Sequence, residues 1–155
     1  MANDLSPGRR APAFRLATED GEVSTAKLKG KPFILYFYPK DDTSGCTKEA
    51  VSFSDEKRTF DALGVTIIGI SKDSVGSHRK FREKHGLSIV LASDPDTMTA
   101  KAYGVWIEKK LYGRCYMGMD RATFLVDSKG IVKQIWRKVK VPGHVAAVLE
   151  AARAL

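Results

Sequence analysis

A buried strand that runs directly into a polar turn and a cysteine constrains this 155-residue chain more than any other feature. The run 33–38 is short, apolar and largely aromatic and stops at Pro39, which predicts a buried strand. Residues 41–45 are mostly turn formers, and Cys46 follows where a helix can begin. Unpaired N–H groups and the positive end of the helix dipole stabilise a thiolate at such a position. The stretch therefore predicts a reactive Cys46, with an inert core cysteine as the alternative.

The composition predicts a single folded domain covering residues 1–155. A hydrophobic fraction of 43% argues against disorder, and no stretch approaches the roughly 18–20 apolar residues of a membrane span. Residues 1–10 lack the apolar core of a secretory signal, and two cysteines are too few for a disulfide framework. We therefore expect a cytoplasmic protein in a reducing compartment, without a membrane partner.

The charge pattern does not predict a binding function. The formal net charge is +8, but the lysines and arginines are scattered and no nucleic-acid motif accompanies them, so no nucleic-acid partner is expected. His78, His85 and His144 lie far apart without ligand spacing, so neither a metal nor a cofactor is expected.

Strands and helices alternate along the chain, and a hairpin and a helix close it. The predicted strands cover residues 14–18, 22–25, 33–38, 65–71, 89–92, 122–126 and 131–137. The predicted helices cover 47–63, 75–85, a segment from Asp94 toward Tyr103 and a segment after Gly143, while 104–118 is expected to be irregular. This order predicts an α/β fold, a central mixed β-sheet flanked by helices, with an N-terminal β-hairpin. A right-handed crossover then places Cys46 beyond the carboxyl end of a central strand, where open α/β sheets carry their sites.

The residues around the cysteine carry a resemblance to a known family. Pro39, Thr43 and Cys46 stand in the spacing Pro-x-x-x-Thr-x-x-Cys, which resembles that of the peroxiredoxins. The text from Tyr36 to Glu49 resembles the bacterioferritin-comigratory, or Q-type, branch, as do Tyr112-Gly113, Gly118, 121–124 and 141–144. The resemblance covers nearly the whole chain. It implies a thioredoxin-like fold and the reduction of hydrogen peroxide and organic hydroperoxides.

The resemblance also implies roles for five residues. The Cys46 thiolate would attack the peroxide O–O bond and become a sulfenic acid. The Thr43 hydroxyl would hydrogen-bond the peroxide oxygens, and Pro39 would shield the sulfur from water. Arg121 would stabilise the thiolate by its charge, and Glu49 would orient the guanidinium and help bind substrate. Taken singly, each residue also has a purely structural interpretation, such as a turn, a strand end, a surface charge or a favourable acid in a first helical turn.

The chain departs from the Q-type pattern at the second cysteine. Many members carry a resolving cysteine five residues after the first, where this chain has Val51, and no cysteine occurs in residues 74–85. Cys115 is the one candidate left. We therefore expect a one-cysteine mechanism recycled by an external thiol (thioredoxin, glutaredoxin or a small thiol) in a monomer or weak dimer.

Two alternatives remain open: a two-cysteine peroxidase that resolves through Cys115, and a non-enzymatic binding protein with a thioredoxin fold. A disulfide reductase is disfavoured because Glu49 stands where a Cys-x-x-Cys motif needs its second thiol.

Overall fold

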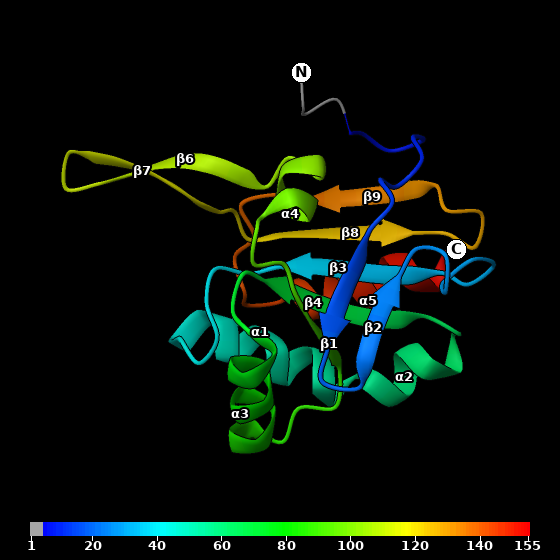
Figure 1. Ribbon diagram of the computed structural model, residues 1–155. Helices are drawn as coiled ribbons and strands as arrows, with labels where there is room; N and C mark the ends of the chain where they lie inside the picture. The colour runs from blue at the N-terminus through cyan, green and yellow to red at the C-terminus, as the bar shows by residue number, and fades with distance from the viewer. Residues whose placement is uncertain (1–4) are drawn as a thin grey trace.

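A seven-stranded mixed sheet forms the centre of the molecule in the computed structural model, which describes residues 5–155 (Figure 1). Residues 1–4, part of the segment expected to lack a secretory signal, lie outside the described residues. The strands are β1 (Arg15–Thr18), β2 (Gly21–Ser24), β3 (Phe33–Phe37), β4 (Thr66–Ser71), β5 (Val90–Ser93), β6 (Trp106–Leu111), β7 (Arg114–Met119), β8 (Ala122–Val126) and β9 (Val132–Trp136). Their order in the sheet is β2-β1-β5-β4-β3-β8-β9, with β6 and β7 forming a separate pair. The predicted mixed α/β sheet with an N-terminal hairpin is confirmed.

Strand β3 holds the sheet together because both of its neighbours pair with it along its full length. It runs parallel to β4 and antiparallel to β8, and all five of its residues are buried. Successive side chains of a strand point to opposite faces. Leu35 and Phe37 accordingly join one apolar cluster, with α4 and the N-terminal segment, whereas Ile34 and Tyr36 join the other, under α1, α3 and α5. Because both faces of β3 are buried, its position in the sheet is fixed, and so is the position of the turn that follows it.

The helices are α1 (Ser44–Asp55), α2 (Lys57–Ala62), α3 (Val75–His85), α4 (Met98–Ala102) and α5 (His144–Arg153). Helix α3 has the predicted bounds, with the Ser74 hydroxyl capping its start and Gly86 in the left-handed region at its end. Among residues 5–155 no helix is long and apolar enough to cross a membrane.

The single helix predicted for residues 47–63 is wrong, because the structure has two helices there. Glu56 separates them, with φ −98° and ψ 6°, and its N–H bonds back to the carbonyls of Phe53 and Ser54. Serine and aspartate compete with the helix backbone for hydrogen bonds. At this point Ser54 bonds Ser88 through both its hydroxyl and its carbonyl oxygen. The prediction also placed the start of α1 too late, so Cys46 lies inside the first turn.

The segment expected to be irregular, residues 104–118, instead contains a regular antiparallel hairpin of β6 and β7. Its turn residues, Tyr112 and Gly113, both have positive φ, 51° and 77°, which suits the tight turns that match strand twist. Tyr-Gly is not one of the usual turn pairs, so the signal for a hairpin turn here is weak. The hairpin projects from the body of the molecule (Figure 1).

Candidate active site

The reactive-cysteine candidate lies in the first turn of α1, just beyond the carboxyl end of β3. Thr43 is the N-cap residue with an extended backbone, and the turn starts at Ser44. Cys46 is only 1% exposed and packs in the cluster that contains Tyr36 and Phe53. The first-turn position leaves its N–H without an acceptor inside the helix, so that group can donate to a bound oxygen.

Arg121 reaches this buried sulfur from the start of β8, the strand that pairs with β3. Strand β8 pairs with β3 so that Ala122 lies beside Phe37, which places the preceding residue, Arg121, next to the β3–α1 turn. Its Nη2 donates to Cys46 Sγ at 3.3 Å, and its Nη1 donates to Glu49 Oε1 at 2.8 Å. The guanidinium therefore bridges a thiol and a carboxylate that are both on α1.

Burial sets the electrostatics of this cluster. Glu49 is completely buried, which raises its pKa to about 7 although Arg121 acts in the opposite direction. Burial also opposes the charge on Arg121, but Cys46 and Glu49 outweigh it and hold the pKa of Arg121 above its usual value. Within residues 5–155, Glu49 Oε2 and the Tyr36 hydroxyl have no hydrogen-bond partner. The permanent cation here is Arg121.

A glycine allows this approach. A Cβ at Gly45 would lie 3.2 Å from Arg121 Nη2, so a side chain there would press on the guanidinium where it contacts the sulfur. Sequence reasoning treated Gly45 only as a turn former.

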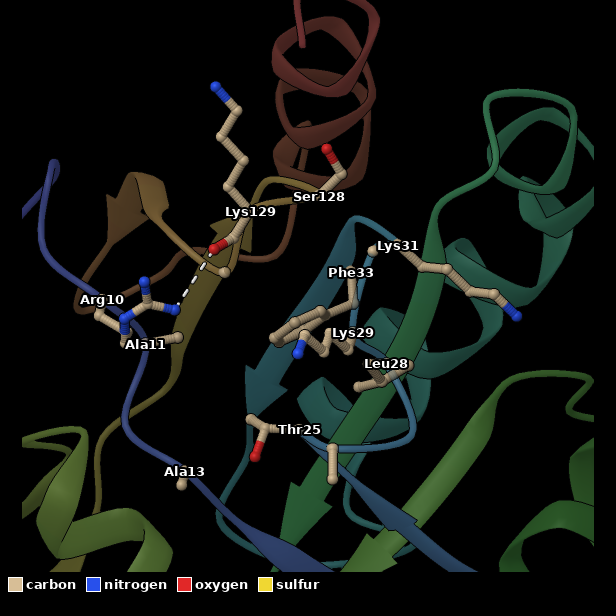
Figure 2. A pocket seen from close by; sticks show the side chains of 13 residues that line it. Arg10, Ala11, Ala13, Thr25, Leu28, Lys29, Lys31, Phe33, Ser128 and Lys129 are labelled. Carbon is tan, nitrogen blue, oxygen red and sulfur yellow. Dashed lines mark hydrogen bonds between the residues drawn. The ribbon is translucent and has the colours of Figure 1, made fainter.

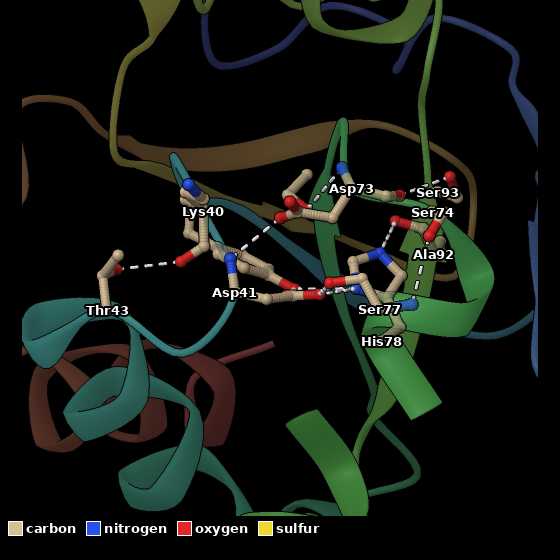
Figure 3. A network of polar contacts seen from close by, with 11 residues as sticks. Lys40, Asp41, Thr43, Asp73, Ser74, Ser77, His78, Ala92 and Ser93 are labelled. Carbon is tan, nitrogen blue, oxygen red and sulfur yellow. Dashed lines mark hydrogen bonds and ion pairs between the residues drawn. The ribbon is translucent and has the colours of Figure 1, made fainter. Parts of the chain in front are cut away.

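Thr43 and Pro39 lie on the turn that leads to Cys46. The structure records no contact between either residue and the Cys46 sulfur. Thr43 is exposed, and its hydroxyl donates to the Lys40 carbonyl oxygen at 2.9 Å (Figure 3). Its proton is thus already used, and its oxygen keeps a lone pair for an incoming O–H group. Pro39 is half-buried, two residues beyond the end of β3.

A buried polar network, which sequence reasoning missed, ties this turn to α3 (Figure 3). The Asp41 carboxylate contacts His78 Nδ1 at 2.7 Å and accepts from the hydroxyls of Tyr38 at 2.6 Å and Ser77 at 2.8 Å. His78 Nε2 lies 3.1 Å from the Ala92 carbonyl oxygen. Both ring nitrogens thus lie within hydrogen-bond distance of an oxygen atom, so the ring joins the Asp41 turn to the Ala92 backbone. Such a network fixes the turn that carries the site.

A second buried histidine, His144, lies near Arg121 and packs edge-on against Phe53. His144, at the start of α5, has its Nε2 2.8 Å from the Thr123 hydroxyl. Burial and the nearby Arg121 lower the pKa of His144 to about 4, so its ring is neutral near pH 7. Within residues 5–155, no group of three or more His, Cys, Asp or Glu side chains could hold a metal ion.

The structure does not bring Cys115 to Cys46. Cys115 is exposed on β7, opposite Lys110 and four residues before Met119. At roughly 3.3 Å per residue, Cys115 lies about 13 Å along β7 from Met119, the buried residue at the end of the strand. Val51, at the position of the missing resolving cysteine, packs against the apolar cluster between α1 and α5.

Comparison with known proteins agrees with the family resemblance of the sequence around Cys46. The AhpC/TSA family profile matches residues 7–135. A putative peroxiredoxin bcp of Coxiella burnetii is 50% identical over 146 residues, which cover 94% of this chain and 97% of that protein. Peroxiredoxin Bcp of Bacillus subtilis is 47% identical, with 92% of each chain covered. A structure of the bacterioferritin comigratory protein of Xanthomonas campestris superposes with a TM-score of 0.87 at 42% identity, covering 91% of this chain and 90% of that one.

The chain belongs to the AhpC/TSA family, whose thioredoxin-like fold and thiol chemistry agree with the site described above. Within that family it is a peroxiredoxin of the Bcp, or Q-type, branch, a thiol-dependent peroxidase.

Proposed function

We propose that this peroxidase reduces hydrogen peroxide and organic hydroperoxides at Cys46, and that residues 1–155 act as one domain. The contact between Arg121 Nη2 and Cys46 Sγ, backed by Glu49, is the observation that carries the assignment of the site. The Xanthomonas campestris relative is described as having alkyl peroxide reduction activity, which supports organic hydroperoxides as substrates here.

The reaction needs a thiolate and a stabilised leaving oxygen. The Cys46 thiolate attacks one peroxide oxygen, the S–O bond forms as the O–O bond breaks, and the second oxygen leaves with the electron pair. That oxygen takes a proton and departs as water or an alcohol. Arg121 and the Cys46 N–H are positioned to stabilise the developing charge, and the Thr43 oxygen is available to accept from the peroxide O–H.

Recycling by an external thiol completes the cycle. One reductant thiol attacks the Cys46 sulfenic acid and releases water, and a second thiol breaks the mixed disulfide to restore Cys46. Val51 at the resolving position and the outlying place of Cys115 favour this one-cysteine route. We propose thioredoxin, glutaredoxin or a small thiol as the reductant, a monomer or weak dimer as the working state and the cytoplasm as the location.

The test replaces Cys46 by serine, which keeps the shape of the side chain but is not ionised near neutral pH. Cys46→Ser should fold as wild type by circular dichroism and consume no peroxide in the presence of a thiol reductant. Retained consumption in the folded variant would contradict the assignment of Cys46.

A further inference from the structure

A cavity of about 570 Å³ lies at the amino end of β3, the opposite end of the strand from Cys46 (Figure 2). Its walls come from the segment before β1, the turn after β2, the first residue of β3 and the β8–β9 turn. The apolar part of the lining consists of Ala11, Ala13, Leu28 and Phe33, with Ala26. The volume falls in the range of roughly 300–1,000 Å³ that small-molecule sites occupy.

Backbone hydrogen bonds hold these walls in place. The Ala11 N–H donates to the Gly130 carbonyl at 2.9 Å, which joins the N-terminal segment to the β8–β9 turn. The Lys31 N–H donates to the Leu28 carbonyl at 2.9 Å, and the Phe14 N–H donates to the Thr25 hydroxyl at 3.2 Å. The cavity is therefore preformed, and a ligand need not order its walls.

The charge around the cavity has one sign. The charged residues of the lining are Arg10, Lys29, Lys31 and Lys129, and within residues 5–155 none of them forms an ion pair. In Figure 2 the heads of Arg10 and Lys29 turn toward the space between them, whereas Lys31 and Lys129 point away. The neighbouring Asp127 carboxylate accepts from the N–H groups of its own turn, Lys129 and Ile131. Two cations thus face a preformed apolar hollow without a carboxylate partner.

We propose that this cavity binds a small carboxylate that carries an apolar chain or ring. The apolar body lies against Phe33 and Leu28, and the carboxylate lies between Arg10 and Lys29. Arginine suits this task because its planar fork matches the two carboxylate oxygens. The length of β3 separates the cavity from Cys46, so the ligand is distinct from the peroxide and does not block its reduction.

The experiment uses the fluorescent probe anilinonaphthalene sulfonate, an anion with an aromatic body, and decanoate as the competitor. Wild type should bind the probe, and decanoate should displace it while decanol of the same chain length competes much more weakly. Lys29→Gln and Arg10→Gln should each raise the dissociation constant of the probe by about tenfold, the value of one charge-assisted hydrogen bond.

Two further variants decide between this cavity and the general positive charge of the surface. Lys140→Gln removes one exposed cation from a distant loop and should leave the dissociation constant unchanged. Ala26→Trp changes no charge, places an indole at an exposed position of the lining and should block binding. The proposal is overturned if Lys140→Gln weakens binding as much as Lys29→Gln, or if Ala26→Trp binds as wild type does. Melting temperatures equal to that of wild type establish that each variant is folded.

Discussion

Cys46 combines two properties that rarely occur together, since its side chain is 1% exposed and its sulfur still contacts a cation. A buried cysteine in apolar surroundings is inert, because desolvation opposes the thiolate. Arg121 supplies the charge that the apolar neighbours do not, and Glu49 holds Arg121 in place. The reactivity of Cys46 is thus a property of three side chains, of which one comes from a distant part of the chain.

Thr43 and Arg121 are expected to act on different steps. Arg121→Gln should slow both the alkylation of Cys46 by iodoacetamide and its oxidation by peroxide, since both need the thiolate. Thr43→Val should leave alkylation near wild type and slow the reaction with peroxide on the order of 100-fold, because it removes the hydroxyl oxygen that can accept from the peroxide O–H. Stopped-flow fluorescence and alkylation followed by mass spectrometry give the two rates. Thr43→Ser, which keeps the hydroxyl, is the control. Equal slowing of alkylation in Arg121→Gln and Thr43→Val would contradict this division.

Glu49 and His144 should give stability opposite dependences on pH. Burial raises the pKa of Glu49 from 4.5 to about 7, so between these values the folded state binds more protons than the unfolded state. The free energy of unfolding therefore falls as pH rises, by about 3 kcal/mol in all. Burial lowers the pKa of His144 from 6.5 to about 4, so over that interval the unfolded state binds more protons and stability rises with pH by a similar amount.

Urea unfolding at several pH values tests both groups against wild type, so that the remaining titrations cancel. Relative to wild type, Glu49→Gln should gain stability as pH rises from 4.5 to 7, and His144→Gln should lose relative stability from 4 to 6.5. Parallel pH profiles for the two variants and wild type would show that neither pKa is shifted as described.

At the scale of the elements, β3, the turn after it and α1 form one unit that the buried pair of Asp41 and His78 attaches to α3. Both side chains are almost completely buried, at 4% and 1% exposure. Removing one partner of a buried hydrogen-bonded pair leaves the other polar group without its partner, which is strongly destabilising. The pair is therefore expected to fix the turn that carries Thr43 and Cys46.

His78→Gln should lower the free energy of unfolding by about 3 kcal/mol. It should also speed amide hydrogen exchange in residues 41–46, which mass spectrometry of peptides can follow. His85→Gln on the same helix is the matched control, because His85 pairs with Asp42 at the surface and its loss should cost less than about 1 kcal/mol. If both variants lose the same stability, or if exchange in residues 41–46 is unchanged in His78→Gln, the proposed support of the turn is wrong.

The order and type of most elements could be predicted from the sequence because apolar periodicity and caps are local signals. Helix α3 and the C-terminal helix α5 follow directly from such signals at Ser74, Gly86 and Gly143. The break at Glu56 lies beside Ser54, which bonds Ser88, a residue 34 positions away in the chain, and such a long-range contact leaves no local signal. The β6–β7 hairpin was missed because Tyr112 adopts a positive φ that its residue type does not favour.

For the whole molecule, the candidate site divides into a local part and a long-range part. Pro39, Thr43, Cys46 and Glu49 lie in one stretch of chain, so strand, turn and helix signals could place them together. Arg121 joins them only through the pairing of β3 with β8, and the resemblance to a family, rather than any local pattern, identified it. Asp41 and His78 carried no signal at all, because two ordinary polar residues 37 positions apart become partners only in the fold.

The whole-molecule arrangement also predicts how the enzyme is recycled. Cys115 is exposed on the hairpin, and Val51 of α1 packs against the apolar cluster, so we expect the sulfenic acid on Cys46 to have no thiol partner within bonding distance. Cys115→Ser should keep most of the turnover with a small thiol or a glutaredoxin-like reductant. Intact mass after one equivalent of peroxide should show a sulfenic acid, and excess peroxide should drive it to sulfinic acid. If wild type forms a disulfide between Cys46 and Cys115 and the variant stalls after one cycle, the two-cysteine alternative is correct.

The break between α1 and α2 has a mechanical consequence. An unbroken helix is a stiff rod, and a rod reaching from Cys46 to Leu63 would carry any twist at the sulfur to its far end. Glu56 ends the first helix, so α1 is a separate 12-residue helix. Helix α2 is held independently by Phe60, whose carbonyl oxygen accepts from the Val65 N–H. A cysteine introduced at position 51 is therefore expected to reach Cys46 by unwinding of α1 alone, while α2, beyond Glu56, keeps its structure.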